Sequence, residues 1–171
     1  MNIGLEITKK TQKYRELLGR LESGLNDTKK YNFVHLPTRS DTKKTINSLD
    51  VLVSYGIDEQ TFNMRSDTLK WIHFGTAGVD HCLSDSVLSS RVIISNSIGI
   101  HAEPVAEFVI GTILYFYKQF SGAIKFMNTG EWSQWNLAKK IVHCSGQTIG
   151  IIGYGSIGKA IAKQAKALGM R

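Results

Sequence analysis

The sequence predicts an α/β protein whose strands form a parallel sheet. Two observations support this fold class. Short apolar, β-branched segments alternate with helix-like segments along the first hundred residues, and a strand-like run, a cluster of glycines and a helix-like run follow one another near the C-terminus. Alternation of strands and helices favours a parallel sheet, because each crossover helix returns the chain to the start of the next strand. The 171 residues, 42% of them hydrophobic, suffice for one large domain or two small ones.

The first part of the chain contains predicted strands separated by helices. Strands are expected at residues 2–7, 31–36, 51–55, 69–74 and 91–95, and helices at residues 8–25 and 81–88. Pro37 ends the second strand. A short helix carrying Ile46 and Leu49 follows it, and Ser40 or Asp41 is expected to cap that helix. This order of short strand–helix units is typical of a flavodoxin-like domain.

The glycine cluster has the spacing G-x-G-x-x-G. Residues 148–152 predict a strand buried on both faces, and a helix follows the cluster and ends at Gly169. In this spacing Gly153 permits the tight turn, Gly155 lets the backbone approach a pyrophosphate, and Gly158 lets the helix pack closely on the strand. Phosphates then bind the free N–H groups at the positive end of the helix. The pattern predicts dinucleotide binding, and a glycine-rich turn of an unrelated α/β fold is the alternative.

The choice between NAD and NADP depends on the second strand of such a unit. Met170 and Arg171 are expected to open that strand. The acidic residue that binds the adenosine ribose lies about 20 residues beyond the glycines, at the end of the strand. The sequence therefore predicts NAD or NADP as the cofactor without deciding between them.

Composition argues against several other classes of function. The net charge is +7, but the lysine pairs are dispersed rather than gathered on one face with aromatic residues, so nucleic-acid binding is not expected. The longest apolar stretch, residues 105–120, is interrupted by polar residues and is shorter than the roughly 20 residues that a membrane span needs. Cys82 and Cys144 have no metal-ligand spacing, so both are expected to be packing residues, with no disulfide and no metal site. A cytoplasmic location is the default expectation.

A turn of small residues follows the fourth predicted strand. Residues 71–80 read WIHFGTAGVD. Because no bulky side chain shields them, the backbone N–H groups of Ala77, Gly78 and Val79 are free to face an anion. The segment therefore predicts an anion-binding turn. The alternative is a plain strand-to-helix turn in which Asp80 is the N-cap.

A long apolar helix is predicted after residue 100. It begins near Pro104, whose missing N–H costs nothing in the first turn of a helix. Its aromatic and aliphatic residues need burial against a large surface, which a helix joining two domains would provide, as would an ordinary core. We therefore place a domain boundary near residue 100.

These segments together resemble the D-isomer-specific 2-hydroxyacid dehydrogenases. The matching motifs are, in order, Thr76-Ala77-Gly78-Val79-Asp80, Asn96-Ser97, Val105-Ala106-Glu107, Gly130-Glu131-Trp132, and GQTIGIIGYGSIG from residue 146. Each motif is weak alone, but five in register over residues 50–171 make a specific signal. The family commonly has Asn-Thr-Pro where this chain has Asn96-Ser97-Ile98.

The resemblance implies a two-domain oxidoreductase that interconverts a D-2-hydroxy acid and its 2-keto acid by hydride transfer with NAD(P). In that family an NAD(P)-binding Rossmann domain is inserted into a flavodoxin-like substrate domain, and the enzyme commonly forms a homodimer. Residues 1–100 would be the first, incomplete part of the substrate domain. Residues 101–171 would be an interdomain helix and the first βα unit of the Rossmann domain, and the chain would continue to about twice its present length.

The resemblance also implies roles for particular residues. Ala77, Gly78 and Val79 would donate backbone N–H groups to a substrate carboxylate. His101 would face the cleft between the domains, with a surface histidine beside a helix as the alternative. The pyrophosphate turn would consist of Gly153, Tyr154, Gly155, Ser156, Ile157 and Gly158, with the N–H groups of Ser156 and Ile157 as phosphate donors.

The catalytic residues of the family match none of these 171 positions. In the family an arginine polarises the keto group, and a histidine held by a glutamate is the general acid and base. All three would lie beyond Arg171, so we expect no turnover by this chain alone. Two alternatives stay open: a non-catalytic chain that pairs with a partner through unfinished sheet edges, and a dinucleotide-binding module that has lost the reaction.

Overall fold

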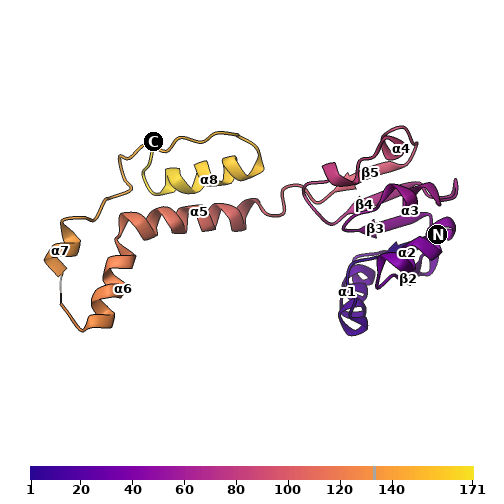
Figure 1. Ribbon diagram of the computed structural model, residues 1–171, viewed down its shortest axis with the longest axis horizontal. Helices are drawn as coiled ribbons and strands as arrows, with labels where there is room; N and C mark the ends of the chain where they lie inside the picture. The colour runs from indigo at the N-terminus through magenta and orange to yellow at the C-terminus, as the bar shows by residue number, and fades with distance from the viewer. Residues whose placement is uncertain (133) are drawn as a thin grey trace. The chain divides into compact units, whose positions relative to one another are not determined.

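The computed structural model describes residues 1–132 and 134–171, which form two compact units. The first unit is Met1–Ile98 and the second is Gly99–Arg171. The first unit contains a β-sheet with helices packed on it, whereas the described part of the second is made of helices and loops (Figure 1).

A parallel sheet forms the centre of the first unit. Its strands in chain order are β1 (Asn2–Leu5), β2 (Asn32–His35), β3 (Val51–Ser54), β4 (Trp71–Phe74) and β5 (Ile93–Asn96). They lie side by side in the order β2-β1-β3-β4-β5, and every pair is parallel. This is the strand order of flavodoxin-like folds. The predicted fold class is therefore confirmed, and the strand ends lie within two residues of the predicted ones.

The strands of the first unit are connected by short helices. These are α1 (Thr11–Ser23), α2 (Arg39–Thr45), α3 (Glu59–Asn63) and α4 (Asp85–Leu88), with the 3-10 helices η1 (Thr28–Lys30), η2 (Ile46–Ser48) and η3 (Asp80–Cys82). The predicted helix at residues 8–25 corresponds to α1. The predicted helix at residues 81–88 is divided into η3 and α4, and α3 has no predicted counterpart.

The cap of α2 differs from the predicted one. The N-cap is Thr38, whose hydroxyl accepts a hydrogen bond from the N–H of Asp41 at 3.3 Å. The carboxylate of Asp41 accepts in return from the N–H of Thr38 at 3.1 Å. This is a capping box, in which two residues satisfy each other's free N–H groups. The prediction that Ser40 or Asp41 caps the helix is wrong, because Asp41 acts from the third helical position.

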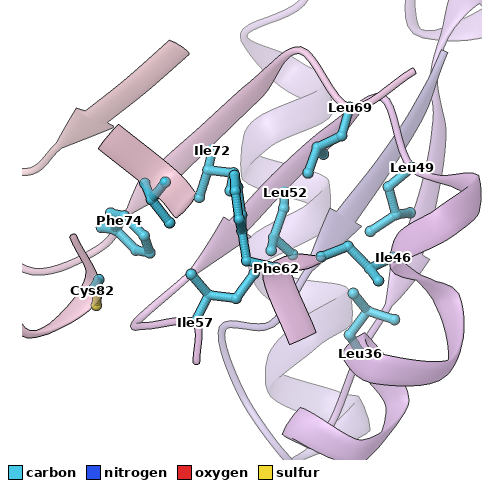
Figure 2. Close-up of a cluster of buried hydrophobic side chains, with 11 residues drawn as sticks. Leu36, Ile46, Leu49, Leu52, Ile57, Phe62, Leu69, Ile72, Phe74 and Cys82 are labelled. Atoms are coloured by element: carbon cyan, nitrogen blue, oxygen red, sulfur yellow. The ribbon is translucent and has the colours of Figure 1, made fainter. Parts of the chain in front are cut away.

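One face of the sheet is buried under α3, α4 and the residues that follow α2. Alternate residues of a strand point to the same side, so Leu52 of β3 and Ile72 and Phe74 of β4 share this face, and all three are fully buried. Phe62 of α3 packs against them (Figure 2). The whole cluster is Leu36, Ile46, Leu49, Leu52, Ile57, Phe62, Leu69, Ile72, Phe74, Cys82 and Val87. Cys82 is thus a packing residue, as predicted.

The second unit is built around a pair of helices. Its helices are α5 (Ala102–Tyr117), α6 (Phe120–Thr129), α7 (Gln134–Ala138) and α8 (Ser156–Ala167). Helices α5 and α8 lie side by side (Figure 1). The buried cluster here consists of Ile110, Cys144, Ala165 and Met170, so Cys144 is also a packing residue, as predicted. No helix within the described residues is both long enough and apolar enough to cross a membrane.

Residues 148–152 do not form the predicted buried strand. Ile152 is fully exposed and Ile149 is half-buried. One parallel pairing is made here: the N–H of Arg171 donates to the carbonyl of Gln147, and the N–H of Ile149 donates to the carbonyl of Arg171, both at 2.7 Å. A strand forms through its hydrogen-bonded neighbours. No other described segment pairs with this run, so its apolar side chains have no sheet to enter.

The carboxyl group of Glu6 lies just after β1 and is partly buried. The hydroxyl of Thr42 donates a hydrogen bond to it. Desolvation raises the pKa of Glu6 above its ordinary value of 4.5, and the Thr42 hydrogen bond, the charge of Arg39 and the hydroxyl of Ser54 offset only part of this effect. The folded state therefore holds the Glu6 proton more tightly than the unfolded state does.

We expect this difference to appear as a loss of stability when the pH rises. Between pH 4.5 and the higher pKa of the folded state, the folded protein binds more protons than the unfolded chain, so the free energy of unfolding falls as the pH increases. Glu6→Gln keeps an acceptor for Thr42 and should remove this fall. The check is urea denaturation of the variant from pH 4 to about 7. Glu16→Gln, at an exposed helix position, is the control, and equal pH slopes for wild type and Glu6→Gln would contradict the prediction.

Candidate functional site

The turn of small residues lies at the carboxyl end of β4. Ala77 and Gly78 are exposed and Val79 is half-buried. Within the described residues, the backbone N–H groups of these three residues donate to no protein acceptor. Asp80 does not cap the helix that follows, because the N-cap of η3 is Val79 and no side chain caps it. An N-cap at Asp80 defined the alternative of a plain strand-to-helix turn, and the structure lacks it. The three N–H groups are unbonded in the described part of the chain and available to a ligand.

The neighbouring strand holds the carbonyl side of this turn. Phe74 at the end of β4 pairs with Asn96 at the end of β5, so the residues that follow the two strands meet at one edge of the sheet. The side-chain amide of Asn96 donates to the carbonyl of Ala77 at 2.6 Å, and the N–H of Ser97 donates to the carbonyl of Thr76 at 3.1 Å. These two hydrogen bonds tie the carbonyls of Thr76 and Ala77 to the end of β5, while the N–H groups of residues 77–79 stay unbonded within the described residues.

An aromatic side chain on the adjacent strand borders the same turn. Tyr55 follows directly after β3 and is 52% exposed. A Cβ atom at Gly75 would lie 2.8 Å from the ring of Tyr55, so a larger residue there would push the ring aside. No role was predicted for Tyr55 from the sequence. Its signal was available, because Tyr55 is the last residue of the predicted strand at residues 51–55, and ligands bind at the carboxyl ends of parallel strands.

One buried hydroxyl group in the turn has no partner. The Oγ1 atom of Thr76 is inaccessible to solvent and makes no hydrogen bond within the described residues. A buried hydroxyl without a partner costs about 1–3 kcal/mol, and a functional role is one explanation for such a group. Thr76 immediately precedes the free N–H groups, so the unsatisfied atom lies at the start of the candidate site.

Each glycine of the second candidate site has a separate structural reason. Gly153 has φ +91°, a conformation that other residues rarely adopt. A Cβ atom at Gly158 would lie 2.3 Å from the carbonyl oxygen of Gly153, so helix α8 can approach the turn only with glycine there. A Cβ atom at Gly155 would meet open space, on the side where a ligand can approach the backbone. The tight turn at Gly153 and the close packing at Gly158 are two of the roles that the G-x-G-x-x-G pattern predicts, and the approach of a pyrophosphate to Gly155 stays a prediction.

Helix α8 presents free N–H groups above this turn. The helix begins at Ser156, and no side chain caps it. Its first backbone hydrogen bond runs from the N–H of Lys159 to the carbonyl of Gly155, and the N–H groups of Ser156 and Ile157 have no acceptor within the described residues. Tyr154 is 63% exposed beside them. A free helix N-terminus attracts phosphate, so the residues present fit a dinucleotide pyrophosphate.

His101 lies just before α5 in the second unit. It is exposed, and it is the N-cap by position, although its side chain makes no capping hydrogen bond. Its carbonyl accepts from the N–H of Val105 at 3.1 Å. A role in binding substrate is not visible in these contacts, so the assignment of His101 stays a prediction.

Comparison with known proteins shows which family the chain is similar to. Residues 110–171 match the family model described as D-isomer specific 2-hydroxyacid dehydrogenase, NAD binding domain. D-3-phosphoglycerate dehydrogenase of Methanocaldococcus jannaschii is 29% identical over 135 residues, which are 78% of this chain and 25% of that protein. Glyoxylate reductase of Thermococcus litoralis is 24% identical over 163 residues, covering 88% of this chain and 49% of that protein. The family model and these relatives support a relationship of this chain to the D-isomer-specific 2-hydroxyacid dehydrogenases.

Solved structures of dehydrogenases have the same fold as this chain. A family protein from Aeromonas salmonicida superposes with a TM-score of 0.77 at 23% identity, over 99% of this chain and 51% of that one. The family model covers residues 153–158, which confirms the predicted class of cofactor, NAD or NADP. The chain spans a quarter to a half of the length of the curated relatives named above.

Proposed function

We propose that this chain supplies the carboxylate-binding turn and the pyrophosphate turn of an NAD(P)-dependent oxidoreductase that interconverts a D-2-hydroxy acid and its 2-keto acid. The observation that carries the proposal is the set of free N–H groups at Ala77, Gly78 and Val79. They lie at the carboxyl end of a parallel strand, where ligands bind in open α/β sheets. Relatives are named glyoxylate reductase and hydroxypyruvate reductase, and both of those substrates carry a carboxylate beside a carbonyl group.

In the proposed mechanism this chain binds and orients the reactants. The N–H groups of residues 77–79 donate to the charged carboxylate, and such bonds are about twice as strong as neutral ones. The N–H groups of Ser156 and Ile157 and the positive end of α8 hold the pyrophosphate. The nicotinamide, when bound, supplies or accepts the hydride. His101 is assigned to the substrate side by resemblance, and no residue of this chain is assigned as general acid or base.

An NMR titration of the 15N-labelled 171-residue chain tests both sites separately. Glyoxylate is expected to shift the amide signals of Ala77, Gly78 and Val79, and NADH those of residues 153–158. Gly78→Pro removes one donor and should weaken glyoxylate binding about tenfold or more, the value of one hydrogen bond to a charged group. Gly78→Ala keeps the N–H and meets open space, so it is the matched control. Unchanged amide signals at either site would contradict the proposal for that site.

Turnover separates this proposal from the second candidate function. We expect no oxidation of NADH by the 171-residue chain with glyoxylate, and measurable oxidation would contradict the assignment of the catalytic groups to positions outside it. The second candidate is a non-catalytic chain that binds dinucleotide or pairs with a partner. It is favoured by Ile152, which is fully exposed on a run with one parallel pairing. Binding of NADH by a protein shown to contain only these 171 residues would favour it.

We also propose that the complete protein is a homodimer formed through α6 and α7. Phe120, Ile124, Met127 and Trp135 on these helices are 48–79% exposed, and a hollow of about 590 Å³ lies beside them. Exposed apolar surface of this kind marks an interaction site. A monomer in sedimentation equilibrium of the complete protein would contradict the proposal.

A cytoplasmic location, supported by composition alone, would be contradicted by recovery in a membrane fraction.

A further inference from the structure

The side chain of His73, on β4, bridges two serine hydroxyls, those of Ser95 on β5 and of Ser97 just after β5. Its Nδ1 atom lies 2.9 Å from the Oγ of Ser95, and its Nε2 atom lies 3.1 Å from the Oγ of Ser97. The indole N–H of Trp71 donates to the Oγ of Ser95 at 2.8 Å. His73 pairs with Ser95 in the parallel register, and alternate residues share a side, so these groups form a row on one face of the sheet.

The hydrogen bonds in this row are satisfied when Nε2 of His73 is the donor to Ser97. The hydroxyl of Ser97 donates its one hydrogen to the carbonyl of Phe74 at 3.3 Å. It can then only accept from the ring, so Nε2 of His73 is the donor. In the neutral ring Nδ1 is an acceptor, and the hydroxyl of Ser95, whose oxygen accepts from Trp71, donates to it. With these roles, every donor in the row has an acceptor.

Ser97 connects this row to the carboxylate-binding turn. Its side chain accepts from His73, and its own N–H holds the carbonyl of Thr76. Its neighbour Asn96 holds the carbonyl of Ala77. His73 itself contacts none of the free N–H groups of the turn. The row therefore affects the turn indirectly, because His73 holds Ser97, and Ser97 in turn holds the carbonyl of Thr76.

We propose that His73 is a positioning residue for the carboxylate-binding turn, acting through the Nε2–H···Oγ bond to Ser97. The part of this inference that concerns ligand binding rests on the proposed function. The structural part, the anchoring of Ser97, does not depend on that function. Because a histidine ring, a glutamine and an asparagine place their polar atoms differently, the bond can be tested by substitution.

Two substitutions of His73 separate the two ring nitrogens. Glutamine places an N–H donor near the position of Nε2, whereas asparagine places polar atoms near the position of Nδ1 only. We expect His73→Asn to speed hydrogen exchange of the Ser97 N–H about fivefold and to weaken glyoxylate binding by a similar factor, the value of one neutral hydrogen bond. His73→Gln should restore both to within about twofold, and Ser97→Ala, which removes the acceptor, should behave like His73→Asn. His35→Asn changes another half-buried strand histidine, away from the turn, and should leave both quantities unchanged.

The two readouts distinguish failure of this inference from failure of the proposed function. If wild type shows no amide shift with glyoxylate, the proposed function fails, and the exchange rate of Ser97 still decides the role of His73. Unchanged exchange in both His73→Asn and Ser97→Ala would overturn the inference. Equal losses of exchange protection and glyoxylate affinity in His73→Asn and His73→Gln would overturn it as well. The effect would then come from packing of the His73 ring against the Trp71 ring, with the two ring centroids 6.2 Å apart, rather than from the Nε2 bond. Urea unfolding of each variant verifies that it is folded.

Discussion

Replacing Phe62 with alanine is expected to cost the first unit about 3–5 kcal/mol of folding free energy. The side chain is fully buried at the centre of the main core, between the sheet and α3 (Figure 2). The guanidinium of Arg65 lies 3.9 Å from the centre of its ring, so the substitution also removes this cation–π contact. A domain of this size is stable by about 5–15 kcal/mol, so the loss would be a large fraction of the total.

Urea denaturation followed by the fluorescence of Trp71, the one tryptophan of the first unit, measures this loss. Met64→Ala is the matched control, because Met64 is an apolar residue just after the same helix but is 46% exposed. It should change stability by less than about 0.5 kcal/mol. A loss below about 1 kcal/mol for Phe62→Ala would show that α3 does not close the core.

Gly158→Ala is expected to disrupt the dinucleotide site. The added Cβ would lie 2.3 Å from the carbonyl oxygen of Gly153, which is a backbone atom and can move only with the whole turn. Overpacking of this kind costs about 1–3 kcal/mol of stability. Displacement of the turn from α8 also moves the glycine turn away from the phosphate donors at Ser156 and Ile157, which lie on α8. NADH affinity should therefore fall by more than about tenfold.

Gly150→Ala is the control for this change. Gly150 lies in the same segment, but its added Cβ would meet no atom within 4 Å. Isothermal titration with NADH and urea unfolding of both variants give the affinity and the stability. Equal NADH affinity in Gly158→Ala and Gly150→Ala would contradict the role assigned to Gly158.

The fold class and both turns could be predicted from the sequence because their signals are local. The β-branched runs, the TAGVD turn and the G-x-G-x-x-G spacing each lie within about ten residues, where backbone sterics decide the conformation. The positive φ of Gly153 is one such local requirement. Helix α3 was missed because five residues are too few to show a helical period, although Asp58 accepts from the N–H of Thr61 at 2.8 Å as an ordinary N-cap.

The run at residues 148–152 shows where local signals fail. Its composition is that of a buried strand, yet burial and strand geometry come from neighbours that the composition does not specify. Thr38 shows the same limit on a smaller scale. Ser40 and Asp41 are also good capping residues, and the reciprocal bonds with Asp41 decide that Thr38 is the cap.

By itself the sequence determined the α/β class, the family motifs and the two segments for which we propose anion binding. Only the tertiary structure decided how the first of these segments is held. Residues 73–79 and 95–97 are about twenty positions apart, and the parallel register of β4 with β5 places His73 beside Ser95 and the end of each strand beside the other. Tyr55 joins the same edge from β3. The physical reason is that hydrogen bonds between strands fix distances between remote residues, which no local pattern along the chain encodes.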